Sequence, residues 1–486
     1  MTKLFQYIVK PTGCQAWLWL VLMTVSGCKK YLDVPLPADQ IAGSAVFQND
    51  NTAAGALNGV YYNLVNQSVF AGLSGVGGYT GLYGDELKNQ SIAPSLLALY
   101  GDGVSSTVGG VTGYWTNFYS QLYSVNLAIQ GLKSANNLSY QSQWLGEAYF
   151  LRGLFYFYLT NLYGDVPLVL GTDYLANNLL ARSPQADVYK QIISDLQQAQ
   201  SLLDSKYHND AGGVTTDRGR PNKSAATALL ARVYLYTKDW KNAESQAGSL
   251  IADGADYLLP ALSKVFLLNS PEIIWGLEPV SGYLYPYLVY DVPNYYLPAG
   301  VTPSSVSVNA TLSDSLAGAF EPGDARYSVW IGKDTVPASG GLPMSVYFFP
   351  TKYTARGTYT APQEMITLFR LAEQYLIRAE ARAQESNPGG AISDLNVVRA
   401  RAGLGATTAN TQADILAAIL RERRAELFTE EGHRFFDLRR TGNLDAVMNI
   451  TAPLKGGTWN SQKAWWPISL TDIQNDTHLT QTPGYQ

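Results

Sequence analysis

The amino-acid sequence predicts a mainly α-helical protein, a tetratricopeptide-like helical-repeat scaffold of about four helix pairs that carries a loop-rich irregular insertion. Three observations support this fold class. Apolar residues recur at helical spacing in several segments, small residues gather where two such segments would pack together, and one long stretch loses the helical period. A chain of 486 residues could hold two or three average domains, yet helical arrays also grow to this length as one body, so length alone leaves the number of domains open.

The clearest helix pair is predicted between residues 223 and 253. Its first helix is rich in alanine and leucine from Ser224 to Leu235, and its second helix runs from Trp240 to Asp253. Small residues let the two helices approach closely, and Asp239 stands in the turn between them as an N-cap. The segment therefore has the helix-turn-helix pattern of a repeat unit.

A second copy of this pattern lies in the carboxyl-terminal part. A helical run from Arg370 to Ala381 is followed by a turn at Asn387-Pro388-Gly389-Gly390 and by a second run from Ala391 to Leu395. Helical spacing between Leu145 and Leu162 and between Val188 and Leu202 predicts another pair. Such pairs stack side by side into a superhelix.

Two segments interrupt the helical pattern. A Gly- and Ser-rich stretch between residues 72 and 113 is too long for an ordinary connection, so it is a candidate binding loop. From residue 257 to about residue 363, Pro, Gly, Ser and aromatic residues dominate. We therefore divide the chain into a signal segment 1–27, a tether 28–41, an N-terminal helical region 42–256, a loop-rich insertion 257–362 as the candidate ligand face, and a C-terminal helical region 363–486.

The amino-terminal segment has the pattern of a bacterial lipoprotein signal peptide. Two lysines precede an apolar run from Ala16 to Val25, and Ser26, Gly27 and Cys28 follow it. The run is shorter than the roughly 20 residues of a membrane-spanning helix, so it indicates export. Cleavage before Cys28 would let its thiol carry lipid and would leave residues 29–486 tethered to a membrane. An ordinary secretory signal with an incidental cysteine is the alternative.

The composition argues against several classes of protein. Cys14 and Cys28 are the two cysteines, so the mature chain would have no disulfide and no cysteine metal site. His208, His433 and His478 are far apart and match no zinc-binding spacing, so we predict no metal and no cofactor. The net charge of −5 argues against nucleic acid as a partner.

The 33 tyrosines and 10 tryptophans are the unusual feature of the composition. Sugars present apolar C–H faces bordered by hydroxyls, so rings beside amide and carboxylate groups suit a glycan. Most single rings are nevertheless expected to pack between helices, and Trp115 is expected to face the core. The alternation of Tyr283, Tyr285 and Tyr287 would place three rings on one side of an extended segment, unless this row packs on the scaffold.

We predict that ligand contacts come from rings and polar side chains of both insertions. Aromatic stacking would combine with hydrogen bonds from carboxylate and amide groups. The predicted ligand-binding residues are Tyr79, Tyr83, Asp85, Asn89, Tyr283, Tyr285, Tyr287, Tyr290, Asp291, Tyr295, Tyr296 and Trp330.

No residue pattern indicates catalysis. Glycoside hydrolysis needs two carboxylates held roughly 5 to 10 Å apart, and the adjacent Asp85 and Glu86 favour hydrogen-bonding roles. A serine nucleophile has no Gly-x-Ser-x-Gly turn to present it. Charged residues of the C-terminal region are expected to form structural ion pairs: Glu422, Arg423, Glu426, Glu431, Arg434, Asp437, Arg439 and Arg440.

Short motifs that recur in one known family occur from end to end of the chain. They include Cys28-Lys29-Lys30-Tyr31-Leu32-Asp33-Val34-Pro35, Tyr163-Gly164-Asp165-Val166-Pro167, Gly219-Arg220-Pro221, Glu422-Arg423-Arg424-Ala425-Glu426-Leu427 and Gln481-Thr482-Pro483-Gly484-Tyr485. Through these residues the chain resembles the SusD/RagB family of outer-membrane glycan-binding lipoproteins of Bacteroidetes. The family terminus usually has Asn where Thr482 stands here.

The resemblance implies a tetratricopeptide-type scaffold without catalytic activity. It implies a lipid-anchored protein of the outer membrane that captures oligosaccharide and passes it to a TonB-dependent, SusC-like transporter. Surface display is expected, although Lys29 and Lys30 stand where surface lipoproteins favour acidic residues. Two other functions stay open from the residues: a peptide-binding lid of a similar transporter, and a surface glycoside hydrolase.

Overall fold

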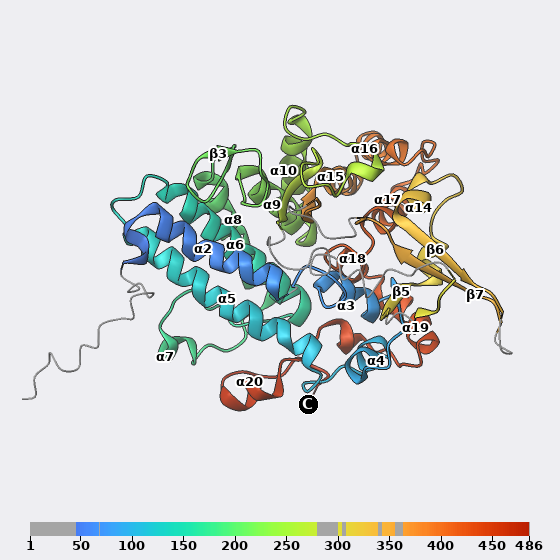
Figure 1. The fold of residues 1–486 in the computed structure, drawn as a ribbon, viewed down its shortest axis with the longest axis horizontal. Coiled ribbons are helices and arrows are strands. Elements are labelled where there is room, and N and C mark those ends of the chain that lie inside the picture. Colours follow the sequence, from blue (N-terminus) through green and yellow to red (C-terminus); the bar gives the residue numbers. More distant parts are fainter. Residues whose placement is uncertain are drawn as a thin grey trace, which may run out of the picture. The chain divides into compact units, whose positions relative to one another are not determined.

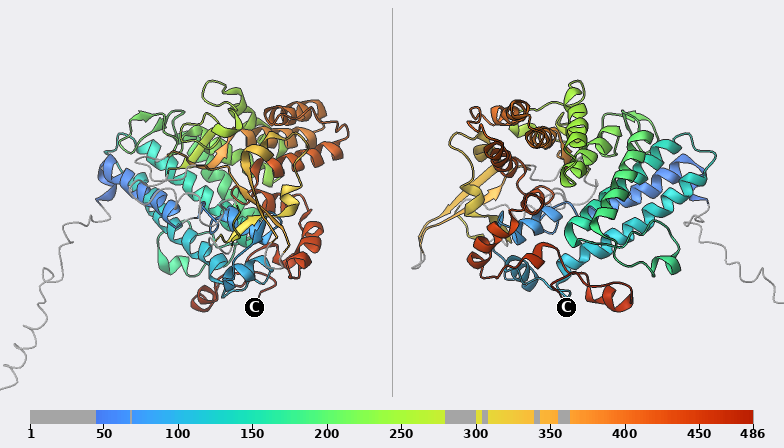
Figure 2. Two further views of the ribbon diagram at one scale, coloured as in Figure 1. Left: turned by 45° about the vertical axis from the view of Figure 1, so that its right-hand side comes forward. Right: turned by 180° about the vertical axis from the view of Figure 1, so that it is seen from behind.

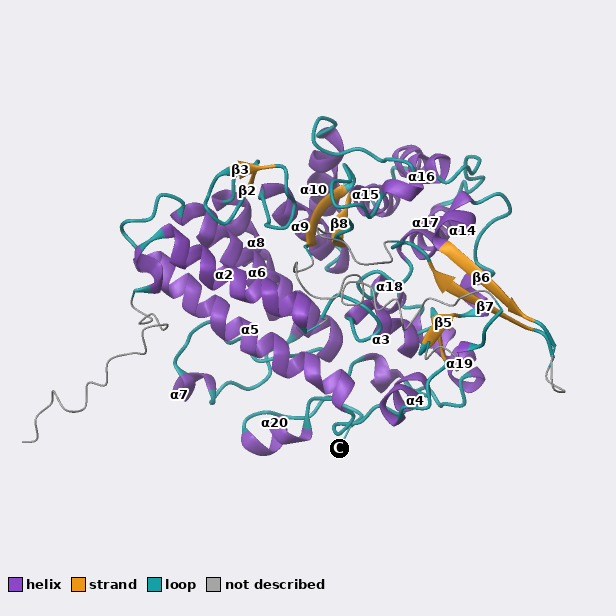
Figure 3. Cartoon of the chain, viewed as in Figure 1, coloured by secondary structure: helices purple, strands orange, loops and turns teal. Residues whose placement is uncertain are grey.

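A computed structural model describes residues 45–67, 69–278, 300–303, 308–338, 343–354 and 363–485. The chain divides into two compact units, residues 1–46 and 47–486, and nearly all described residues belong to the second. Helices dominate this second unit, and its strands are few and short (Figure 3). The predicted signal segment, the predicted lipidation site Cys28 and the predicted tether lie outside the described residues.

Helices packed in chain order form the scaffold of the second unit (Figure 1). Each of these helices contacts the next one along the chain, as the views in Figure 2 also show. The predicted pairs between residues 145 and 202, in 223–253 and in 370–395 are confirmed, and α2 with α5 makes a fourth pair. The helices are α2 (Asp50–Asn66), α5 (Gly109–Ser134), α6 (Gln141–Tyr163), α8 (Gln185–Leu202), α9 (Lys223–Tyr236), α10 (Trp240–Ala252), α15 (Leu371–Gln384) and α16 (Pro388–Arg401).

Further helices and short elements complete the described part of this unit. The helix α17 packs against α15 and α16, and α18 packs against both α17 and α19. The remaining elements are η2 (Val46–Gln48), α7 (Tyr174–Asn177), β2 (Tyr207–His208), β3 (Val214–Thr215), η3 (Leu262–Lys264), α17 (Gln412–Leu427), α18 (His433–Arg440), α19 (Leu444–Leu454), η5 (Ser461–Ala464) and α20 (Leu470–Asn475).

Side-chain caps fix where the paired helices begin. The Asp239 carboxylate accepts a hydrogen bond from the backbone N–H of Asn242 at 3.3 Å, which confirms the predicted N-cap of α10. The Asn387 side chain likewise accepts from the backbone N–H of Gly390 at 3.0 Å at the start of α16. Both turns therefore have a local cause in the sequence.

The core is built around α6, whose side chains are nearly all buried. Its Tyr156 and Tyr158 lie in the interior, and Trp115 on α5 is only 5% exposed. These positions confirm that many of the rings pack between helices and that Trp115 faces the core. A Cβ added at Gly153 would lie 3.0 Å from the Leu196 side chain, so glycine permits the close approach of α6 and α8.

The first interrupting segment is more regular than the predicted loop. It contains α3 (Val76–Tyr83), β1 (Leu87–Asn89), α4 (Pro94–Tyr100) and the start of α5. A Cβ at Gly78 would lie 2.2 Å from the backbone oxygen of Leu73, so this glycine serves close packing. The expectation of a long loop was therefore wrong, because glycine content alone does not distinguish a flexible loop from a tightly packed helix.

The second interrupting segment is also partly regular. Its strand β5 pairs with β1 of the first segment, in an antiparallel sheet of order β1-β5-β7-β6. The two segments predicted as separate insertions therefore share one sheet. Its elements are β4 (Ile273–Leu277), β5 (Ala310–Leu312), α13 (Asp314–Ala317), α14 (Ala325–Trp330), β6 (Ile331–Val336) and β7 (Ser345–Pro350), and β4 pairs with β8 (Ile366–Arg370), which immediately precedes α15.

The charged C-terminal cluster forms buried ion pairs, as predicted. The Arg423 guanidinium lies 2.6 Å from the Asp437 carboxylate, and Glu422 lies 2.7 Å from Arg326. Arg440 pairs with Asp437 at 2.8 Å. The first two pairs join α17 to α18 and to α14, and the third lies within α18, so all three serve the fold.

Candidate ligand-binding site

Seven of the predicted ligand-binding residues, the whole tyrosine row and Asp291, lie outside the part of the chain that the structure describes. Tyr283, Tyr285, Tyr287, Tyr290, Asp291, Tyr295 and Tyr296 all lie in 279–299, outside the described residues. Their role as the ligand face remains a prediction.

Two of the other predicted rings lie in the protein interior. Tyr83 is fully buried, and its hydroxyl donates a hydrogen bond to the backbone oxygen of Lys463 at 2.9 Å. Trp330 is 1% exposed, and its Nε1 donates to the backbone oxygen of Leu262 at 3.1 Å. Both side chains are enclosed by core residues, so the prediction that they contact a ligand is not supported.

Tyr79 and Asn89 are half-buried positions of the first interrupting segment. The Tyr79 ring meets the Tyr114 ring edge to face, with centroids 6.0 Å apart. The Asn89 amide donates to the backbone oxygen of Ser91 at 2.8 Å and accepts from its N–H at 3.1 Å. Asn89 is therefore held by a local turn at the end of β1.

Asp85 is a structural anion. Its carboxylate accepts two hydrogen bonds from Arg434, at 2.9 and 2.8 Å, and one from Arg424 at 3.0 Å. Burial alone would raise the pKa of Asp85, but the hydrogen bond from Arg434 and the charges of both arginines lower it overall. The carboxylate is 95% out of solvent and fully occupied, which corrects the expectation that it binds ligand.

A pocket of about 420 Å³ lies beside the C-terminal half of α2. We call it the α2 pocket. It adjoins the chain position where the tyrosine-rich segment begins, because Glu278 is both a lining residue and the last described residue before 279–299. Its lining residues are Asn58, Tyr61, Tyr62, Val65, His208, Asn209, Asp210, Asp217, Gly219, Arg220, Leu277 and Glu278.

One wall of the α2 pocket is held rigidly. The Tyr61 hydroxyl donates to the Glu147 carboxylate at 2.8 Å, and Arg220 lies 2.8 Å from the same carboxylate. The Arg220 guanidinium also stacks over the Tyr61 ring, 5.3 Å from its centroid. The neighbouring Tyr62 is 44% exposed, so its ring is available to a ligand.

Two carboxyl groups of the α2 pocket interact directly. Partial burial, the charge of Asp217 and a hydrogen bond with Asp217 together raise the pKa of Glu278 to about 7. Near neutral pH the Glu278 carboxyl is therefore partly protonated, so it can donate hydrogen bonds to hydroxyl groups as well as accept them.

The raised pKa of Glu278 predicts that the free energy of unfolding depends on pH. Because the folded protein holds this proton more tightly than the unfolded chain, the stabilising contribution is fully present below about pH 4.5 and is lost as the pH rises through about 7. We expect the melting temperature to fall less between pH 5 and pH 8 in Glu278→Gln than in the wild type. Thermal unfolding of both proteins at the two pH values checks this, and equal slopes would contradict it.

The α2 pocket offers carboxyl, amide and aromatic groups to a ligand. His208 is occupied by the Gly212 oxygen at 2.7 Å and by Asp204 at 3.0 Å. Across the described part of the chain, no cluster of His, Cys, Asp and Glu is arranged to hold a metal ion.

The sequence carried little signal for this pocket. Gly219-Arg220-Pro221 matched a family motif, but Asp217 and Glu278 come from different connections with no characteristic spacing. Tyr61 and Tyr62 are adjacent on α2, yet one is fixed against Glu147 and the other is exposed. Only the fold brings these residues together.

The fold and this pocket define a helical-repeat binding protein, and comparisons with known proteins agree. A family model described as "SusD family" matches residues 329–485. A second model, described as "Starch-binding associating with outer membrane", matches residues 80–235, so the two matches together cover well over half of the chain. The chain belongs to the SusD/RagB family.

Relatives and solved structures extend over most of the chain. The SusD-like protein P25 of Formosa agariphila is 24% identical, over 88% of this chain and 90% of that protein. A SusD superfamily protein from Bacteroides vulgatus superposes with a TM-score of 0.75 at 22% identity, over 90% of this chain and all of that structure. A laminarin-binding SusD-like protein superposes with a TM-score of 0.73 at 24% identity, with 90% and 100% covered.

Proposed function

We propose that this protein is a lipid-anchored glycan-binding protein of the outer membrane, which captures oligosaccharide and delivers it to a TonB-dependent, SusC-like transporter. The observation that carries the proposal is the α2 pocket, where an exposed tyrosine and hydrogen-bonding carboxyl groups adjoin the start of the tyrosine-rich segment. Family membership supports glycan as the ligand, since one matching model is described as starch-binding and one structural neighbour binds laminarin.

The chemistry of the pocket suits a sugar. The exposed face of Tyr62 offers a platform for the C–H face of a pyranose ring. Asp217 and Glu278 supply hydrogen bonds to the ring hydroxyls, and Asn58 and Asn209 add amide groups on the same lining. Binding without cleavage is part of this proposal, and it is supported by relatives whose descriptions name binding.

The tyrosine row should supply most of the glycan affinity. We expect the double variant Tyr285→Ala/Tyr287→Ala to weaken glycan binding about tenfold or more, because each lost stacking ring removes on the order of 1 kcal/mol. Affinity electrophoresis in gels that contain the glycan, together with thermal unfolding, checks this. The control is Tyr174→Ala, which removes a 73% exposed ring on α7. Equal loss of binding and of stability in the double variant would mean that the rings are core.

The lipid anchor depends on Cys28. We expect Cys28→Ala to release the protein from membranes, because the protein then lacks the lipid-bearing thiol. None of the described helices is long and apolar enough to cross a bilayer. Fractionation of cells into membrane and soluble material measures the effect, with Cys14→Ala as the matched control that should stay membrane-bound. Persistent membrane association of Cys28→Ala would contradict the anchor.

The transporter partner is tested at native expression level. Purification from detergent-solubilised outer membrane is expected to yield this protein together with a large TonB-dependent barrel protein. A monomer free of any barrel protein would count against delivery to a transporter, while leaving glycan binding itself intact.

A further inference from the structure

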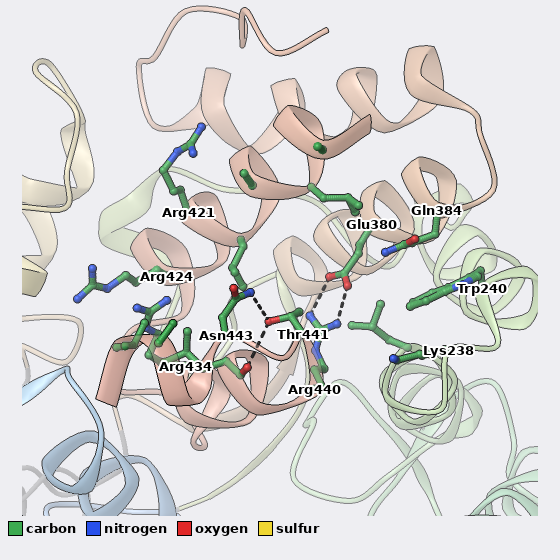
Figure 4. Close-up of a pocket in the computed structure, with 18 residues that line it drawn as sticks. Lys238, Trp240, Glu380, Gln384, Arg421, Arg424, Arg434, Arg440, Thr441 and Asn443 are labelled. Carbon is green, nitrogen blue, oxygen red and sulfur yellow. Dashed lines mark hydrogen bonds and ion pairs between the residues drawn. The ribbon is translucent and has the colours of Figure 1, made fainter. Parts of the chain in front are cut away.

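A second and larger pocket, of about 730 Å³, lies between α10, α15, α17, α18 and α19 (Figure 4). We call it the α17 groove. It shares no lining residue with the α2 pocket, and the proposed glycan site does not use it. Figure 4 shows Lys238 and Trp240 on one side of the groove and Arg421 and Arg424 on the other.

The helix α17 has two apolar stripes. Ile415 and Ile419 lie fully buried on the core side. A second stripe, Ala413, Leu416, Ala417 and Leu420, lines the groove, and its members are exposed or half-buried. These positions recur every three or four residues, which is the spacing of a helix face that packs against another helix. In the described structure no helix covers this face.

The wall opposite this stripe mixes aliphatic side chains with polar ones and with the Trp240 ring. Leu438 of α18 and Val447 of α19 line it, together with Leu235 at the end of α9. Sugars are bound by aromatic platforms and hydrogen-bonding groups. Trp240 is the one ring among the described lining residues, whereas eight of them are Ala, Leu or Val, which offer a sugar neither kind of contact. Such a lining suits the apolar side chains of a polypeptide.

Most charged residues of the groove are already paired. Arg440 is held by Glu380 at 2.8 Å and by Asp437 at 2.8 Å, and both Arg424 and Arg434 are held by Asp85. Among the described residues, Lys238 and Arg421 form no ion pair, although Arg421, after Arg399, helps to lower the pKa of Glu321. Among the described residues, the groove therefore presents at each side one cation that forms no ion pair, in a chain whose net charge is −5.

We propose that the α17 groove is a docking site for an acidic amphipathic helix of a partner protein. Apolar side chains of that helix, spaced three or four residues apart, would pack against the Leu416 and Leu420 stripe. Carboxylates that flank them would meet Arg421 on one side and Lys238 on the other. The cationic lining selects against basic segments.

Selection from a random peptide display library on the full wild-type chain tests the proposal. We expect the selected peptides to be enriched in Asp and Glu beside Leu, Ile or Phe. Synthetic copies should bind the wild type at least tenfold more tightly than Arg421→Glu and Ala417→Glu. Both substitutions are at exposed helix positions, so both variants should fold, and thermal unfolding verifies that they do.

Matched controls separate the groove from general effects of charge. Lys333→Glu on β6 and Leu175→Glu on α7 alter exposed residues outside the groove and should bind the selected peptides as the wild type does. Selected peptides that are basic, or that bind Arg421→Glu as well as the wild type, would overturn the proposal. So would displacement of the peptides by an anionic polysaccharide at the same site. Glycan binding should be unchanged in all four variants, so failure here is distinct from failure of the proposed function.

Discussion

Replacement of Arg370 by alanine is expected to lower the free energy of unfolding by roughly 3–5 kcal/mol, the usual result when one partner of a buried ion pair is removed. Arg370 closes β8 and is 1% exposed. Its guanidinium lies 2.8 Å from Glu272, 2.6 Å from Glu426 and 2.7 Å from Glu430. Truncation would leave these three buried carboxylates short of a cation.

Neighbouring cations cannot fully compensate. Burial lowers the pKa of Lys352 to about 8, despite its ion pair with Glu430 at 2.5 Å, and Arg401 already serves Glu272 and Glu426. Denaturant unfolding measures the loss. The control is Lys190→Ala, whose pair with Asp187 is exposed on both sides and should change stability by less than about 1 kcal/mol. An Arg370→Ala protein as stable as the wild type would contradict the account of this network.

Asp85→Asn is expected to lower the free energy of unfolding by about 3 kcal/mol while leaving glycan affinity unchanged below the unfolding transition. The variant keeps the size of the side chain but removes the charge that Arg424 and Arg434 share. Because Asp85 is 5% exposed, no ligand reaches its carboxylate. The effect on binding should therefore follow only from unfolding.

Two measurements on the same protein separate these roles of Asp85. Denaturant unfolding measures the stability lost with the ion pairs, and glycan titration at low temperature measures the affinity of the binding site. Asp187→Asn, which removes the exposed partner of Lys190, is the control for stability. Weakened glycan binding in an Asp85→Asn protein of normal stability would mean that Asp85 contacts the ligand.

The helix pairs could be predicted because their causes are local. The alanine-rich run before Asp239, the cap itself and the copy around Asn387 each lie within a few residues of the helix that they specify. The fold class follows from such signals. Trp115 was likewise predicted from its helical spacing to face the core, as it does.

The candidate site could not be predicted in the same way. Asp85 resembles a ligand residue in the sequence, but its partners Arg424 and Arg434 stand 339 and 349 residues later, and no local pattern connects them. The α2 pocket joins Tyr62, Asp217 and Glu278 from three separate segments. The glycines of α3 were read as a loop, because close packing and flexibility favour the same residue.

Calorimetric titration of residues 29–486 with laminarin and with a panel of plant, fungal and host polysaccharides, followed by product analysis, tests the central claim most directly. The account predicts saturable binding to at least one glycan with no cleavage product. Casein-derived peptides in the same titration distinguish the peptide-binding alternative. Binding of those peptides with no glycan bound, or release of shortened sugars from any mixture, would contradict the account.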